Sequence, residues 1–80
     1  MPESAKKLNQ LSVIPLYKQL KKIIEDDIDQ GLLQPGQLLP SEMELSHRHG
    51  VSRITVRTAL QELTDEGRLI RRRGKGTFVT

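Results

Sequence analysis

The chain has 80 residues, of which 35% are apolar and 2% aromatic, and it carries a formal net charge of +3 at pH 7 with no cysteine. This length allows one small domain with a single core, and the lack of cysteine excludes disulfides, a thiolate nucleophile and a cysteine zinc site. Because no run of about 18 apolar residues and no apolar segment after Met1 is present, we expect a cytoplasmic protein without a membrane span or secretory signal.

Charge is divided unevenly along the chain. Residues 1–44 carry five lysines against seven acidic residues, whereas residues 45–80 carry seven arginines and one lysine against three acidic residues. Arginine suits bidentate contacts with guanine edges and phosphates, but a solvated basic face without a partner would give the same asymmetry. Because Tyr17 and Phe78 are the only aromatic residues, base stacking on a single-stranded nucleic acid is disfavoured.

The first predicted element is an amphipathic helix. Residues 1–12 are polar without a sustained period, so we expect a flexible leader before a domain at 13–80. The helix has Pro15 in its first turn and ends at Gly31. Its apolar residues recur at helical spacing: Leu16, Leu20, Ile23, Ile24 and Ile28. Its lysines lie toward the N-terminus and its acids toward the C-terminus, against the helix dipole. Either the lysines face an external anion, or packing outweighs this cost.

A second, shorter helix is predicted after a turn. Pro35-Gly36 marks the turn, and residues 37–39 are long enough only for a short strand. Ser41 and Glu44 then fit a capping box, in which each side chain satisfies a backbone N–H of the first helical turn. Gly50 closes this helix, because glycine adopts the left-handed conformation that ends helices.

The third predicted helix runs from about Arg53 to Glu66, with Ser52 as its cap. Two helices joined by a tight turn that contains glycine, the second richer in arginine, form the pattern of a helix-turn-helix. The core face of the third helix is expected to comprise Val56, Ala59, Leu60 and Leu63. The opposite face comprises Ile54, Arg57, Thr58 and Gln61.

Two features of this helix point to a partner. Arg53 and Arg57 are like charges four residues apart, which destabilise a helix unless an anion such as DNA lies beside them. Ile54 lies off the core face, where it could touch a thymine methyl group. Packing of Ile54 against Val51 or the preceding turn is the alternative, and the residues alone leave it open.

The last predicted element is a β-hairpin. Residues 77–80 are rich in strand formers, and Arg73-Gly74-Lys75-Gly76 supplies two glycines for the turn. Leu69 or Ile70, together with Phe78, is expected to face the helices. The tip then projects as a basic wing, which suits a minor groove or flanking phosphates.

No catalytic, metal or cofactor site is predicted. Six residues separate Gly67 from Gly74, and a glycine follows Lys75, so the phosphate-loop pattern of an ATPase fails. His47 and His49 point about 200 degrees apart on a helix, so they cannot share a metal without other ligands, and we expect both to be solvated or capping. No nucleophile, base and orienting group occur at a recognisable spacing.

The sequence resembles the DNA-binding domain of GntR-family bacterial transcription regulators, most closely the HutC branch. The resemblance covers residues 13–80 without forced gaps. The segments that carry it are Pro15-Leu16-Tyr17, Gln19-Leu20, Gly31, Pro35-Gly36, Leu39-Pro40-Ser41-Glu42, Val51-Ser52-Arg53, Thr55-Val56-Arg57, Ala59-Leu60, Leu63, Glu66-Gly67 and Gly74-Lys75-Gly76-Thr77-Phe78-Val79.

The resemblance implies an α+β winged helix-turn-helix with three helices, a short C-terminal β-hairpin wing and a small sheet. It implies that a dimer binds operator DNA, with the third helix in the major groove and the wing in the minor groove. Arg53 and Arg57 correspond to base-reading arginines, Ser41, Ser52 and Thr55 to phosphate contacts. Together with the features above, the expected DNA-binding residues are Ser41, Ser52, Arg53, Ile54, Thr55, Arg57, Arg72, Arg73, Gly74, Lys75 and Gly76.

One departure from the family concerns Met43, which stands where the family usually has a DNA-contacting arginine. Recognition is then expected to rely more on the third helix and the wing, or the operator differs there. Family members continue into a domain that binds a small metabolite and dimerises, so we expect this chain to be an isolated DNA-binding domain of a metabolite-responsive repressor. The alternatives are a winged helix used for protein contact and a nucleotide-handling enzyme; gel-shift competition on duplex DNA and ATP turnover would reveal them.

Overall fold

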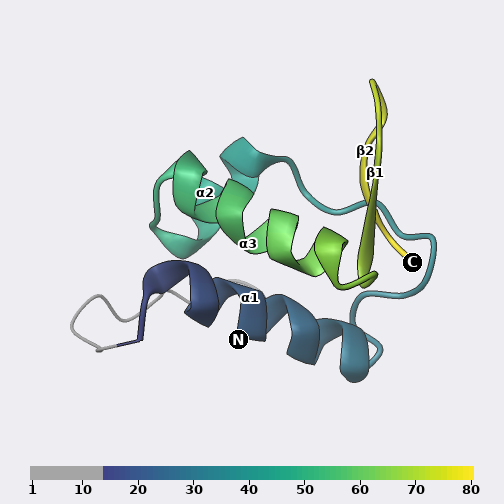
Figure 1. Ribbon diagram of the computed structural model, residues 1–80, viewed down its shortest axis with the longest axis horizontal. Coiled ribbons are helices and arrows are strands. Elements are labelled where there is room, and N and C mark those ends of the chain that lie inside the picture. The colour runs from purple at the N-terminus through teal and green to yellow at the C-terminus, as the bar shows by residue number, and fades with distance from the viewer. Residues whose placement is uncertain (1–13) are drawn as a thin grey trace.

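The computed structural model describes residues 14–80, which form three helices followed by a two-stranded antiparallel hairpin (Figure 1). The elements are α1 (Leu16–Asp29), α2 (Glu42–His49), α3 (Arg53–Asp65), β1 (Leu69–Arg72) and β2 (Gly76–Val79). The leader predicted for residues 1–12 lies outside the described residues, and the domain boundary at residue 13 stays a prediction. No helix within residues 14–80 combines the length and the apolar character needed to cross a membrane.

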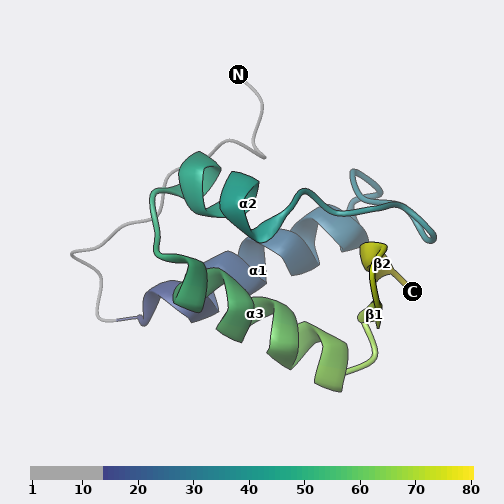
Figure 2. The ribbon, with the colours of Figure 1, turned by 90° about the horizontal axis from the view of Figure 1, so that it is seen from above.

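Helices α1 and α3 pack side by side and supply most of the core (Figures 1 and 2). Pro15 is the N-cap of α1 and precedes the first turn in which it was predicted. The core stripe predicted on α3 is confirmed, since all four of its residues are buried. From α1, Leu20 and Ile24 are buried against it. Two amphipathic helices thereby cover each other's apolar faces, which is what fixes α3 in place.

Local hydrogen bonds at the helix ends follow the sequence prediction. The backbone N–H of Glu44 donates to Ser41 Oγ at 3.1 Å, and the N–H of Ser41 donates to Glu44 Oε1 at 3.3 Å, so the capping box is complete. Gly50 ends α2 with φ 70°, in the left-handed region that glycine adopts without a steric cost. The N–H of Thr55 donates to Ser52 Oγ at 3.2 Å and caps α3. The turn between α2 and α3 is therefore fixed at both ends.

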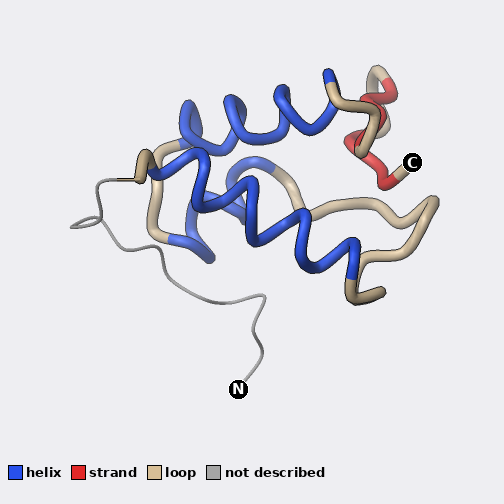
Figure 3. Tube along the Cα trace, turned by 60° about the horizontal axis from the view of Figure 1, so that its bottom comes forward, coloured by secondary structure: helices blue, strands red, loops and turns tan. Residues whose placement is uncertain are grey.

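The hairpin is more than a two-stranded ribbon, because a third segment runs beside β2. Leu38 forms a single antiparallel bridge with Phe78, so the strand predicted for residues 37–39 is reduced to one bridge. The N–H of Leu39 donates to the carbonyl of Thr77 at 2.9 Å, and the N–H of Val79 donates to the carbonyl of Gln37 at 3.0 Å. These bonds anchor the base of the hairpin to the segment that leads into α2 (Figure 3).

The prediction that Phe78 faces the core is wrong. In the hairpin register Leu69 pairs with Val79 and Ile70 pairs with Phe78. Leu69 and Val79 are 2% and 3% exposed and join the core, whereas Ile70 is 41% exposed and Phe78 is half-buried. Side chains alternate along a strand, so placing Leu69 inward sends Ile70 and its partner Phe78 to the other face. The whole architecture is a winged helix-turn-helix of the α+β class, as predicted.

Candidate nucleic-acid interface

The exposed face of α3 carries the residues predicted to read DNA bases. Arg53 is exposed in the first turn, and Ile54 is 71% exposed, the most of any large apolar side chain among the described residues. The alternative that Ile54 is buried by packing is therefore excluded by its exposure. The hydroxyls of Ser52 and Thr55 lie 3.0 Å apart at the start of the helix. Hydroxyl groups and backbone N–H groups at a helix N-terminus suit an anion such as a phosphate.

Arg57 is held by a carboxylate from the preceding helix. Its Nη2 donates to Oε1 of Glu42 at 3.0 Å, and its Nε donates to Oε2 of the same carboxylate at 3.4 Å. The hydrogen bonds and the negative charge of Glu42 raise the pKa of Arg57 above its ordinary value. An anion was expected beside Arg53 and Arg57, because their like charges lie four residues apart. The carboxylate of Glu42 is such an anion, and it belongs to the chain itself. The Arg57 side chain is still 56% exposed, so part of its guanidinium faces solvent.

The wing projects past the helices beyond the end of α3 (Figure 1). Its tip, residues 73–75, is exposed, and β1 ends at Arg72 opposite Gly76. Gly76 has φ 120°, and a Cβ built on it would lie 2.7 Å from Cδ1 of Leu38, so no larger residue fits there without a shift. The segment beside β2 thus sets where the wing leaves the domain.

A groove of about 670 Å³ lies between the wing and the start of α2. Ser41, Glu42 and Glu44 line it from the α2 side, and residues 71–77 line it from the wing. The structure therefore brings the predicted phosphate contact Ser41 and the predicted wing residues to one surface. Residues Ser52, Arg53, Ile54 and Thr55 lie at the first turn of α3 and do not line this groove.

Acidic residues neutralise cations away from this surface. Lys21 of α1 pairs with Glu62 at 3.1 Å and with Glu66, and hydrogen bonds from Glu66 and then Glu62 raise the pKa of Lys21. Arg68 pairs with Asp29 at the other end of α1. The anion faced by Lys21 is therefore internal to the chain, and the hypothesis that it faces an external anion is wrong. Within residues 14–80, no ion pair is formed by Arg53, Arg72, Arg73 or Lys75.

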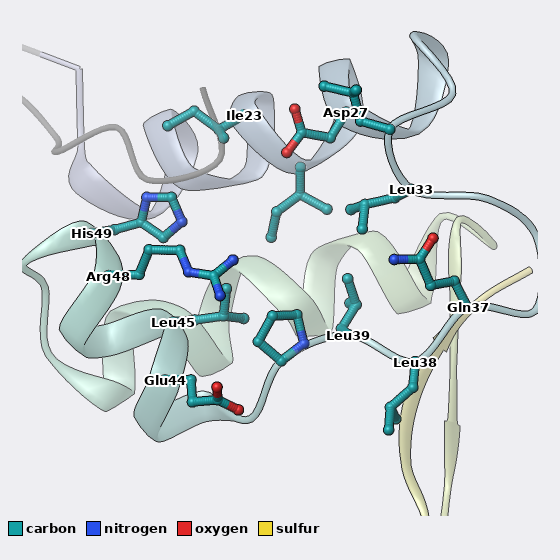
Figure 4. Close-up of a pocket in the computed structure, with 13 residues that line it drawn as sticks. Ile23, Asp27, Leu33, Gln37, Leu38, Leu39, Glu44, Leu45, Arg48 and His49 are labelled. Carbon is teal, nitrogen blue, oxygen red and sulfur yellow. The ribbon is translucent and has the colours of Figure 1, made fainter. Parts of the chain in front are cut away.

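A second hollow, of about 620 Å³, lies between α1, α2 and the segment 32–40 (Figure 4). His49 is 3% exposed and its ring points into this region beside Arg48, so of the two predicted roles, solvated or capping, the first is wrong for His49. His47 is exposed. Among the described residues no group of three or more His, Cys, Asp or Glu side chains could hold a metal. About half of the lining residues are leucine or isoleucine, and the polar ones are Asp27, Gln37, Glu44, Arg48 and His49.

Two residues of the candidate interface were not predicted from the sequence. Glu42 was recognised only as part of the motif 39–42, because nothing local shows that it meets Arg57 fifteen positions later. Arg71 lines the groove beside the wing, and a signal for it existed. Side chains two residues apart share a face of a strand, so Arg71 lies on the same face of β1 as the buried Leu69, at a position outside the core. Met43, which replaces an arginine of the family, is 53% exposed beside Glu42.

Comparisons with known proteins agree with this geometry. The sequence pattern of the bacterial regulatory proteins of the gntR family matches residues 16–79. The chain is 57% identical over 72 residues to the uncharacterized HTH-type transcriptional regulator YurK of Bacillus subtilis (strain 168), covering 90% of this chain and 30% of that protein. It is 48% identical over 65 residues to the histidine utilization repressor of Klebsiella aerogenes, and the match covers 81% of this chain and 27% of that protein. The chain thus spans about a third or less of the length of these relatives.

Solved structures share the fold closely. AraR(DBD), crystallised in complex with operator ORX1, superposes with a TM-score of 0.82 at 41% sequence identity. The match covers 91% of this chain and 87% of that chain. An agreement over this share of the chain includes most of residues 16–79, the range that the three helices and the wing span.

Proposed function

The chain belongs to the GntR family of bacterial regulatory proteins, in its HutC-like branch, and on this premise we propose that residues 14–80 bind double-stranded DNA sequence-specifically. The observation that carries the proposal is the segregation of charge. Arg53 and the wing cations are exposed without an ion pair within residues 14–80, and Arg57 stays 56% exposed beside Glu42. Lys21 and Arg68, by contrast, are paired with acids elsewhere. Exposed arginines on a helix face and on a protruding hairpin are the electrostatic footprint of nucleic-acid binding. The operator named for AraR(DBD) supports the same partner class.

In the proposed complex α3 enters the major groove and the wing enters the minor groove. Arg53 and Arg57 read guanine edges, and Ile54 contacts a thymine methyl group. Phosphates are bound by the hydroxyls of Ser41, Ser52 and Thr55. The wing contributes cations and close backbone approach through Arg72, Arg73, Gly74, Lys75 and Gly76. Arg71, which lines the groove between wing and α2, adds a further cation to this surface.

The regulator to which this domain is proposed to belong is a metabolite-responsive repressor. The histidine utilization repressor and AraR supply the precedent for a repressor and for an operator respectively. We further propose that the regulator is a homodimer and that its effector binds outside residues 14–80. The length of the relatives, of which this chain spans about 30%, leaves room for such a domain.

The test begins with selection of a binding site from random duplexes. On the selected duplex, Arg57→Ala is expected to cost about 1 to 3 kcal/mol of binding free energy, and much less on random DNA, because a bidentate contact to guanine is lost. Fluorescence anisotropy titrations with both duplexes measure the difference. Equal losses on both duplexes would show that Arg57 contacts a phosphate. Failure of the wild-type chain to prefer any duplex would refute the proposed function.

The wing makes a separate prediction about salt. Lys75 is exposed at the tip, so a phosphate contact by its ammonium releases about one counterion. Lys75→Ala is expected to reduce the slope of log affinity against log salt concentration by about one. Lys22→Ala on α1 is the matched control, because Lys22 pairs with Asp26 at 3.1 Å away from the interface. An unchanged slope for Lys75→Ala would mean that the wing tip does not meet the DNA backbone.

A further inference from the structure

We propose that Glu42 is a specificity-determining residue. It binds Nε and Nη2 along one side of the Arg57 guanidinium and so leaves the N–H groups at the end of the guanidinium free to contact a base. This inference rests on the proposed function and adds to it a positioning role for an acid on a surface otherwise suited to polyanions. Glu42 does not itself have to touch DNA for this role. Its effect passes through the two hydrogen bonds to Arg57.

The geometry of the pair decides which donors remain free. Glu42 accepts from Nε and Nη2 of Arg57, the two nitrogens along one side of the planar guanidinium. An arginine has five N–H groups, so the pair uses two of them and leaves those of Nη1 and one of Nη2. These remaining groups lie on the end of the fork, and two parallel donors of this kind match the O6 and N7 acceptors of guanine. The exposed fraction of the Arg57 side chain, 56%, leaves that end accessible.

The carboxylate is held in place by the local structure of α2. Glu42 is the first residue of the helix and directly follows Ser41, whose capping box with Glu44 fixes the first turn. The Glu42 side chain is only 32% exposed, less than that of its partner. Ser52 and the buried face of α3 fix the backbone that bears Arg57. Both ends of the ion pair therefore start from rigid elements, which is the condition for a positioned recognition group.

Stability does not account for the pair. An ion pair between two groups this exposed adds little to the free energy of unfolding, because solvent screens it. Near DNA, moreover, the negative charge of Glu42 repels phosphates and weakens binding to every sequence alike. Without Glu42, Arg57 would be a mobile cation, as able to reach a phosphate as a base. The carboxylate is therefore expected to lower the affinity for all DNA sequences and to increase the discrimination between them.

Glu42→Gln is therefore expected to change two measured quantities in opposite directions, the affinity for random DNA and the discrimination between sequences. Affinity for random DNA is expected to rise, because a negative charge is removed. Discrimination against a single base-pair change at the position that depends on Arg57 is expected to fall about ten-fold, within the about 5- to 150-fold that a bidentate contact supplies. Anisotropy titrations on the selected duplex, the substituted duplex and a random duplex measure both. Glu42→Ala, which leaves no acceptor, is expected to lose at least as much discrimination.

Glu44→Gln is the matched control. It removes the same charge from the same turn, and glutamine preserves a capping box, but Glu44 makes no contact with Arg57 among those found in residues 14–80. The control is expected to raise affinity for random DNA without loss of discrimination. In an Arg57→Ala background, Glu42→Gln is expected to cause no further loss, since the two residues act as one unit.

The outcomes separate this inference from the proposed function. If the wild type prefers its selected duplex and Glu42→Gln keeps full discrimination, Glu42 is only a surface charge and the inference is overturned while the function stands. The same conclusion follows if Glu44→Gln loses as much discrimination as Glu42→Gln. If the wild type shows no preference for any duplex, the proposed function fails and the inference fails with it.

Discussion

Two copies of this chain joined by a flexible linker are expected to bind a duplex with two half-sites about 10² to 10⁴ times more tightly than the single chain does. In the proposed complex, one α3 and one wing cover only one half-site. Joining two copies makes the second contact intramolecular, at up to millimolar effective concentration. Half-sites one helical turn apart lie about 34 Å from each other, and a Gly/Ser linker of about 40 residues has a matching root-mean-square length of about 35 Å.

The controls for this prediction vary the DNA. On a duplex with one half-site the linked chain is expected to gain almost nothing, since its second copy has no target. The single chain is expected to be monomeric in solution and to fill two half-sites with little cooperativity, as measured by analytical ultracentrifugation and by titration. A stable dimer of the single chain in the absence of DNA would contradict the prediction, because residues 1–80 would then contain a dimer interface.

The helix boundaries could be predicted because their causes are local. Ser41, Glu44, Gly50 and Ser52 each act on backbone groups within a few residues, and the structure forms the hydrogen bonds that the spacing predicts. The buried face of α3 could be predicted for the same reason, since its period is that of a single helix. Short-range chemistry of this kind is fully contained in the order of the residues.

The residues that were misjudged depend on distant neighbours. Whether Val79 or Phe78 faces the core is decided by the pairing of Leu69 with Val79, together with the segment that runs beside β2. A strand of alternating apolar residues fits either face until such a neighbour selects one. His49 was different, because a signal for its burial existed. It follows the buried Leu45 by four residues and therefore lies on the same helix face.

In the candidate site, too, features that depend on local sequence could be predicted, whereas contacts between distant residues could not. The exposed arginines of α3 and the wing follow from their positions, but the contact of Arg57 with Glu42 spans fifteen residues and that of Lys21 with Glu66 spans forty-five. Such pairs form only after α1, α2 and α3 have packed. The cations of the candidate interface could therefore be predicted from the sequence, but which of them the fold neutralises could not. That distinction decides which cations remain for DNA.

The orientation of α3 rests on its buried leucines, so Leu63→Ala is expected to lower the free energy of unfolding by about 2 to 5 kcal/mol. Leu63 is 0% exposed and belongs to the core cluster that includes residues of α1 and both strands. Truncation removes apolar contacts and leaves a cavity that a small core closes only in part. For about 80 residues the total stability is on the order of 4 to 12 kcal/mol, so this one change removes a large share.

Urea unfolding followed by circular dichroism measures the loss, with Leu32→Ala as the control. Leu32 is 56% exposed, so its truncation is expected to cost less than about 0.5 kcal/mol. A duplex that binds only the folded state should restore part of the stability of Leu63→Ala, by RT ln(1 + [L]/Kd). Recovery that grows with the logarithm of duplex concentration above Kd would show that the variant still folds into the binding form. A loss for Leu63→Ala no larger than that for Leu32→Ala would contradict the assignment of the core to the face that α3 turns toward α1, and with it the assignment of the opposite face to DNA.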